Sequence, residues 1–168
     1  MKSTKMKREM GVKDLTPEEL ILALMYYSNG SIPGALYLQK LVFLAINEDQ
    51  QNKTGKDAII FKPLNFGPYS NTVTNSLQGL IRKELIVSKK QISNKYNRDT
   101  YLLTDLGKQL SNATIEKLNS SSVEYLRNLC IAGKQLGYSG ILRYVYSKYP
   151  NYTSKSEIID EVFKSYDY

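Results

Sequence analysis

FKPLNFGPYSNTVTNSLQGLIRKELIVSKKQISNKYNRDTYLLT, residues 61–104, decides the fold of this chain. A Gly67-Pro68 pair precedes an amphipathic segment of about four helical turns, which is followed by two β-branched runs joined by a basic, polar loop. Because Pro fixes φ and Gly adopts conformations that other residues avoid, the pair predicts a turn just before a helix. Ser70 is placed to cap that helix, with its hydroxyl accepting a bond from a first-turn amide.

The helix predicted from Ser70 to Glu84 has one apolar and one polar face. The apolar residues recur at the spacing of one helical side: Val73, Leu77, Leu80 and Ile81. At 100° per residue, four amide or guanidinium side chains fall within about 60° on the opposite side; they are Asn71, Asn75, Gln78 and Arg82, the polar stripe. Such side chains can bond to adenine and guanine edges in a major groove, and Ser70 at the start of the helix is a further candidate DNA contact. An ordinary solvated helix face carries the same residue types, so both interpretations stay open here.

The segment after this helix predicts an exposed basic hairpin. Leu85–Ile92 predicts one strand and Thr100–Leu103 a second, around the turn-rich SNKYNRD at 93–99. Between Arg82 and Arg98 six Lys or Arg stand against one Glu, a local charge of about +5. A hairpin of this kind can lie along a phosphate backbone with its tip in a minor groove. The candidate contacts are Lys89, Lys90, Lys95, Tyr96 and Arg98.

Three motifs together carry a family resemblance: FxxxxxGPYS, a helix ending in LIRKELI, and a hairpin closing in YLLTDLG. They resemble a group of small prokaryotic, mainly archaeal, winged helix-turn-helix proteins and, more distantly, the antitoxin domains of some toxin–antitoxin systems. ILRYVYSKYPNYTSKSEI, residues 141–158, is similar to a carboxy-terminal signature of the archaeal group. The resemblance covers about Thr16 to Ile158. It implies a mainly α-helical winged helix-turn-helix core with a small β-hairpin wing and a C-terminal helical extension.

The composition limits the classes of function. A net charge of +7 makes this a basic protein and favours an anionic partner, either nucleic acid or an acidic protein surface. The absence of histidine removes imidazole bases, His-ligated metals and Ser-His triads, and leaves no side chain expected to titrate near neutrality unless its pKa is strongly shifted. The single Cys130 excludes an internal disulfide and a Cys-based zinc site, and its apolar neighbours predict burial. We therefore expect no enzyme, no cofactor and no metal.

The rest of the chain predicts three parts. Residues 1–13 read as a flexible basic arm, 14–113 as the winged helix-turn-helix domain, and 114–168 as the helical extension. No apolar run approaches the roughly 18 residues of a membrane span, and the N-terminus lacks the apolar core of a signal peptide, so we expect a cytoplasmic protein without membrane contact.

Several local signals predict element boundaries. Thr16-Pro17-Glu18-Glu19 is a capping box that opens the first helix, which ends at Asn29-Gly30. The second helix, 35–47, has apolar residues on most sides and should be largely buried. Residues 58–61 predict a short edge strand on the sheet of the wing, and helices follow at 105–113, about 122–134, 141–148 and after Ser154 or Ser156.

Two interpretations of the helical extension, residues 114–168, stay open. It packs onto the back of the core, or it exchanges helices with a second copy to build a homodimer. The function expected from the sequence is double-stranded DNA binding, as a transcriptional regulator. The alternative is an antitoxin-like module that binds an acidic protein partner with the same helix.

Overall fold

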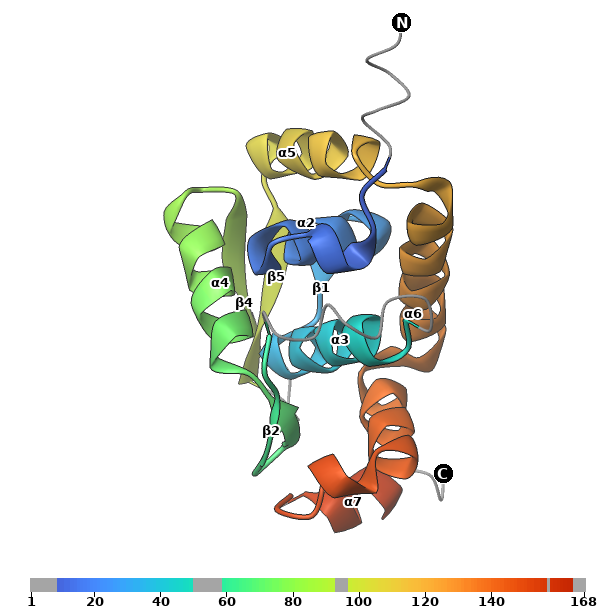
Figure 1. Cartoon of the computed structure of the whole chain (residues 1–168). Helices are drawn as coiled ribbons and strands as arrows, with labels where there is room; N and C mark the ends of the chain where they lie inside the picture. Colours follow the sequence, from blue (N-terminus) through green and yellow to red (C-terminus); the bar gives the residue numbers. More distant parts are fainter. Residues whose placement is uncertain (1–8, 50–58, 93–96, 157, 165–168) are drawn as a thin grey trace, which may run out of the picture.

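The computed structural model describes residues 9–49, 59–92, 97–156 and 158–164. Most of these residues are helical, and the strands include one small three-stranded antiparallel sheet. The elements in chain order are η1 (Val12–Asp14), α2 (Pro17–Tyr27), β1 (Ser31–Ile32), α3 (Ala35–Asn47), β2 (Lys62–Leu64), β3 (Gly67–Tyr69), α4 (Asn71–Arg82), β4 (Ile86–Ile92), β5 (Asn97–Leu103), α5 (Asp105–Glu116), α6 (Ser120–Lys148), η3 (Pro150–Tyr152) and α7 (Ile159–Lys164). Figure 1 shows α2 and α3 at the centre, with α4 on one side and α6 on the other. In the described ranges, no helix is both long and apolar enough to cross a membrane.

The capping box at the start of α2 forms as predicted. The Glu19 amide donates to Thr16 Oγ1 at 3.1 Å, and the Thr16 amide donates to Glu19 Oε1 at 3.0 Å. Asn29 and Gly30, with φ of 60° and 77°, end the helix where the sequence places its end. The reciprocal bonds satisfy two amides that the first turn leaves without a helical partner, which fixes where α2 begins.

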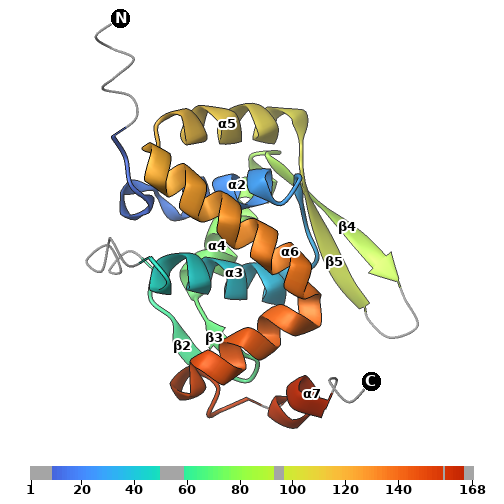
Figure 2. The same cartoon turned by 90° about the vertical axis from the view of Figure 1, so that its right-hand side faces the viewer.

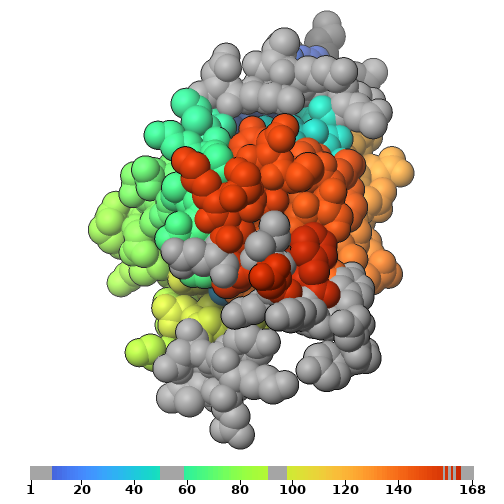
Figure 3. Space-filling view, turned by 90° about the horizontal axis from the view of Figure 1, so that it is seen from below, coloured from blue at the N-terminus to red at the C-terminus, as the bar shows by residue number. Residues whose placement is uncertain are grey.

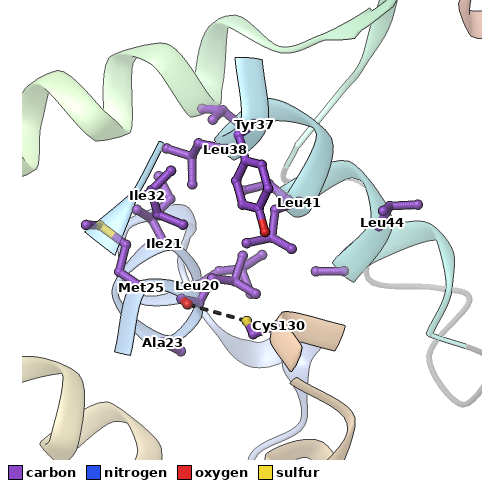
Figure 4. Packing of buried hydrophobic residues seen from close by; sticks show 14 of the residues in the cluster. Leu20, Ile21, Ala23, Met25, Ile32, Tyr37, Leu38, Leu41, Leu44 and Cys130 are labelled. Carbon is purple, nitrogen blue, oxygen red and sulfur yellow. Dashed lines mark hydrogen bonds between the residues drawn. The ribbon is translucent and has the colours of Figure 1, made fainter. Parts of the chain in front are cut away.

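Helix α3 has the predicted bounds and is buried on most sides. Every residue from Tyr37 to Ala45 is buried, including a lysine and a glutamine. The Phe43 ring packs edge-on against Phe61 and Tyr149, with centroids 5.2 and 4.9 Å away. Helix α3 is therefore the centre of the hydrophobic core, and Figure 4 shows its side chains meeting those of α2.

The sheet has the order β1-β5-β4, with both pairs antiparallel. The predicted hairpin forms from β4 and β5, but β5 begins at Asn97, three residues before the predicted Thr100, and Figure 2 shows the hairpin extending away from the helices. The edge strand predicted at 58–61 is wrong: residues 59–61 are not in a strand, Ala58 lies outside the described residues, and β1 occupies the edge instead.

The strands β2 and β3 form a separate hairpin, and this corrects the expected Gly-Pro turn. Gly67 and Pro68 lie within β3, and the turn itself is at Asn65 and Phe66. Pro63 pairs opposite Pro68. Because neither proline has an N–H to donate, the ladder stays short and cannot continue the main sheet.

The segment after the sheet contributes to the same core as the rest of the chain. Helix α6 starts at the Asn119 cap, whose side chain accepts the Ser122 amide at 2.8 Å, and it bends sharply at Gly137 (φ 74°, ψ −176°). Cys130 is buried, as predicted, and its Sγ donates to the Leu24 carbonyl at 3.4 Å (Figure 4). The buried cluster runs from Val12 to Val162.

The predicted basic arm extends too far along the chain. Its residues 1–8 lie outside the described residues, but Met10 pairs with the α5–α6 junction, donating to the Lys117 carbonyl at 3.1 Å and accepting from the Asn119 amide at 2.9 Å. Val12 is buried in the core. The segment from Met10 onward is therefore part of the folded body, because its one large apolar side chain and its backbone both find partners there.

Candidate nucleic-acid interface

Helix α4 presents the polar stripe to solvent. Asn71, Asn75, Gln78 and Arg82 are all exposed. On the other side Val73, Leu77 and Leu80 are buried against the core. The helix is thus held by one face and offers four amide or guanidinium groups on the other, as the periodicity predicts.

The N-terminus of α4 is fixed by Gln39 from α3, a residue that no motif or periodicity in the sequence singles out. The Ser70 amide donates to Gln39 Oε1 at 2.9 Å, and Gln39 Nε2 donates to the Ser70 carbonyl at 3.0 Å and to Thr74 Oγ1 at 3.1 Å. Gln39 is itself buried. These bonds fix the position and orientation of the first turn of α4, and therefore where the polar stripe lies on the surface.

Ser70 is corrected as a candidate contact. It has the extended backbone of an N-cap (φ −130°, ψ 126°), but its hydroxyl makes no capping bond and the residue is only 1% exposed. Since Gln39 holds its backbone from inside the core, Ser70 cannot reach a nucleic acid. The exposed part of the helix starts at Asn71.

A buried lysine lies next to this anchor. Lys40 is 0% exposed, and its Nζ donates to the Pro68 carbonyl at 3.0 Å. Burial lowers the pKa of Lys40 to about 7. Gly67, with φ 89°, leaves room for it, because a Cβ there would lie 3.4 Å from Lys40 Cε and 2.9 Å from Tyr146 Cε1. Lys40 is therefore a group of the strongly shifted kind that the expectation from the sequence left as its exception; the available signal was a lysine within the apolar run LQKLVFLA.

Two of the predicted hairpin cations are in place. Lys89 and Lys90 are exposed on β4, opposite Thr100 and Asp99 of β5. Consecutive strand residues point to opposite faces of a sheet, so the two ammonium groups leave the hairpin on different sides. Lys95 and Tyr96 lie outside the described residues.

Arg98 is corrected as a contact at the tip of the hairpin. Its guanidinium carbon lies 4.0 Å from the centroid of the Tyr138 ring on α6. A guanidinium over an aromatic face is held by the ring quadrupole. Arg98 therefore ties β5 to the bend of α6 and does not extend toward a phosphate.

The surface of α4 is electrostatically uneven. Lys83, just after the helix, is paired with Glu18 of α2 at 2.7 Å. Within the described ranges Arg82, Lys89 and Lys90 have no ion pair, so their charges remain open to an anion. The positive potential that an approaching polyanion meets is thus concentrated at the end of α4 and along β4.

An apolar hairpin tip beside α4 was not predicted as part of the site. Leu64 and Phe66 are each 42% exposed, and Lys62 is exposed at the start of β2. The Tyr69 hydroxyl lies 2.7 Å from Thr74 Oγ1, which fastens this hairpin to the first turns of α4. Seen from below, the green residues of β2, β3 and α4 lie together on one side of the orange and red C-terminal segment (Figure 3).

Comparison with known proteins gives no family: no family model and no curated protein matches this chain. Among the described residues, no group of Cys, Asp or Glu side chains is arranged to hold a metal ion. The function must therefore be argued from the geometry of α4, the β4–β5 hairpin and their surroundings.

Proposed function

We propose that this chain is a winged helix-turn-helix protein that binds double-stranded DNA, with α4 as the recognition helix and β4–β5 as the wing. The order of α2, α3, α4 and a β-hairpin is the order of elements in that fold. The observation that carries the proposal is the polar stripe on α4, a row of amides and a guanidinium without an acidic residue, on a helix whose other face is buried. Such a row is suited to the base edges of a major groove.

The proposed contacts fall into two kinds. Asn71, Asn75, Gln78 and Arg82 would contact base edges and read sequence. Lys89 and Lys90 on the wing would contact phosphates, which are alike in every sequence and so add affinity without specificity. A protein with this division of contacts would act as a transcriptional regulator in the cytoplasm.

A second candidate is an antitoxin-like module that binds an acidic protein through the same helix. The exposed Leu64 and Phe66 beside the first turn of α4 favour it, because partly buried aromatic and aliphatic anchors are typical of protein interfaces. The basic wing would then meet carboxylates in place of phosphates.

We also propose that the chain forms a homodimer. Leu106 and Leu110 are 50% and 42% exposed one helical turn apart on α5, and Ala113 continues the same side. A two-fold dimer through this stripe would present two copies of α4 to half-sites spaced by about one turn of DNA.

The test compares the two kinds of contact on a duplex enriched from a random pool and on unselected duplexes, with competing polyanion present. Gln78→Ala or Arg82→Ala should weaken binding to the selected duplex by about 1–3 kcal/mol and leave random duplexes nearly unchanged. Lys89→Ala or Lys90→Ala should weaken all duplexes alike and lower the salt slope by about one per contact.

Gln135→Ala, at an exposed position on α6, is the matched control and should change neither affinity. If the stripe and wing variants weaken all duplexes equally, α4 reads no bases. If neither set changes DNA binding, the surface serves the protein partner of the second candidate.

A further inference from the structure

The hairpin of β2 and β3 lies directly before α4 in the chain and projects past the start of that helix. Only Ser70 separates Tyr69, the last residue of β3, from Asn71, the first residue of the polar stripe. Each strand has three residues, so the tip reaches about 10 Å from the start of α4 at the rise of a β-strand. Figure 1 shows this hairpin beyond one end of α4, and Figure 2 shows it pointing in a different direction from the β4–β5 hairpin.

Contacts at its base hold the β2–β3 hairpin in this position. Lys40 Nζ donates to the Pro68 carbonyl at 3.0 Å, and the Tyr69 hydroxyl lies 2.7 Å from Thr74 Oγ1 on α4. A Cβ at Gly67 would lie only 2.9 Å from Tyr146 Cε1, and η3 packs against β2. The hairpin therefore has a fixed orientation relative to α4, so a ligand that lies along the polar stripe meets the tip in one defined place.

The tip carries two apolar side chains on either side of an amide. Leu64 and Phe66 are each 42% exposed, and Asn65 between them is exposed as well. Proteins that bind the minor groove of DNA often insert an apolar side chain between two base pairs, and they use amides and cations to contact the groove around it. The residues of the tip are of these types.

The segment that carries the tip has no negative charge. Residues 59–82 contain no Asp or Glu, and their two cations are Lys62 and Arg82. Lys62 is exposed on the strand that leads to the tip, and it belongs to none of the ion pairs between described residues. A phosphate backbone beside the tip would therefore be attracted by Lys62 and would meet no repulsion from this segment.

The small size of the apolar tip favours DNA over a protein as its partner. A stable protein interface covers roughly 800 Å² on each partner, which two side chains that are each less than half exposed do not approach. Insertion into a minor groove needs only one or two apolar side chains. The adjoining surface of α4 adds amides and a guanidinium and no further large apolar group.

We propose that the β2–β3 hairpin is a second DNA-binding element, which inserts Phe66, supported by Leu64, into the minor groove next to the major-groove site of α4. Lys62 would contact the phosphates between the two grooves. The inference rests on the proposed binding of double-stranded DNA and adds a contact that neither the polar stripe nor the wing makes. Insertion unstacks one base step and bends the duplex, and pyrimidine–purine steps unstack most easily.

The first experiment measures the bend of the selected duplex by energy transfer between dyes at its two ends, with the full-length chain bound. The parent chain should bend the duplex by at least about 20°. Phe66→Ala should remove most of the bend and weaken binding to this duplex at least about fivefold. Ile131→Ala, which truncates a similarly exposed apolar residue on α6, is the matched control and should change neither quantity.

The second experiment locates the groove. In the selected duplex, 2,6-diaminopurine replaces adenine at one base pair at a time, which adds an amino group to the minor groove and leaves the major-groove groups unchanged. On one flank of the site this substitution should weaken binding of the parent chain at least about fivefold. The sensitivity should disappear in Phe66→Ala and persist in Lys90→Ala, because the wing does not make this contact.

The outcomes separate this inference from the proposed function. A parent chain that binds no duplex would overturn both. A parent chain whose binding is weakened by Gln78→Ala, but is unaffected by Phe66→Ala and by 2,6-diaminopurine, would overturn the hairpin contact alone and assign the tip to a protein interface. Leu64→Ala gives the same test should Phe66→Ala fail to fold.

Discussion

At the scale of single residues, Lys40 is the least ordinary feature of the chain. An ammonium group with no exposure and only a carbonyl partner is disfavoured in its charged form, which is why burial lowers its pKa to about 7 from 10.5. The folded protein therefore binds fewer protons than the unfolded chain between about pH 7 and 10.5. Across that window the free energy of unfolding rises with pH. Below about pH 7 Lys40 is protonated in both states, and the folded protein bears the full cost of burying the charged ammonium group.

Lys40→Met should remove this pH dependence. From pH 7 to 8.5 the free energy of unfolding of the parent chain should rise by about 1–2 kcal/mol, since each pH unit in the window contributes at most about 1.4 kcal/mol. The variant should show almost no rise, although it loses the bond to Pro68 equally at both pH values. Urea unfolding at the two pH values measures the effect.

The upper limit of pH 8.5 avoids Cys130, for which burial raises the pKa from 9.0 to about 11, so that its contribution opposes that of Lys40 at higher pH. Lys62→Met, an exposed lysine on β2, is the control and should keep the parent slope. An unchanged slope in Lys40→Met would show that the amine is hydrated in the folded protein.

At the scale of elements, α4 is positioned by bonds from α3 and not by its own cap. Gln39 satisfies both the N–H and the C=O of Ser70, so the direction of the polar stripe follows from one side chain 31 residues earlier. Unpaired buried amide groups each cost about 1–3 kcal/mol, which makes this pair of bonds hard to replace.

Gln39→Leu should therefore destabilise the protein by about 1–3 kcal/mol, because a leucine of similar size leaves the buried Ser70 amide without a partner and its carbonyl with the Thr74 amide alone. Urea unfolding gives the difference, and Gln109→Leu on the exposed side of α5 should stay within about 0.5 kcal/mol of the parent. A small effect of Gln39→Leu would mean that α4 can shift to satisfy its own first turn.

At the scale of the whole molecule, the C-terminal helices are part of the core and also leave α5 with an exposed apolar side. Helix α6 packs on α2 and α3, and Tyr125 and Cys130 bond to their carbonyls. Truncation after Ala113 would remove α6 and expose the faces of α2 and α3 that it covers, so the shortened chain should be insoluble. Leu106 and Leu110 on α5, by contrast, remain exposed and are not covered by another segment of the described chain.

Leu110→Glu tests the proposed homodimer. The parent chain should be a dimer at tens of micromolar by light scattering, and the variant should be a monomer, because a carboxylate in an apolar two-fold interface meets its own copy. Affinity for a duplex with two half-sites should fall, and affinity for one half-site should not.

Ile131→Glu is the control on α6 and should remain dimeric. A parent chain that scatters as a monomer at tens of micromolar would remove the dimer, and a dimer that survives Leu110→Glu would place the interface elsewhere.

The sequence by itself determined the elements whose signals are local. The Thr16–Glu19 box, the Asn29-Gly30 stop, the period of α4 and the two strands of the β4–β5 hairpin were all predictable, because capping, periodicity and turn chemistry act between residues a few positions apart. The exposure of the polar stripe followed from the same periodicity.

Only the tertiary structure decided which of the candidate residues reach the surface. Ser70 is held inside by Gln39, Arg98 is drawn onto Tyr138, and Lys40 bonds to Pro68. Their partners come from 28 to 40 positions away, so no local pattern encodes them. A cavity of about 370 Å³ between α3 and α6 depends on the same kind of contact, because residues on both sides of the bend at Gly137 line it together with Leu41 and Leu44 of α3. Local chemistry fixes how each segment folds, whereas the burial and direction of a side chain depend on which distant segment packs against it.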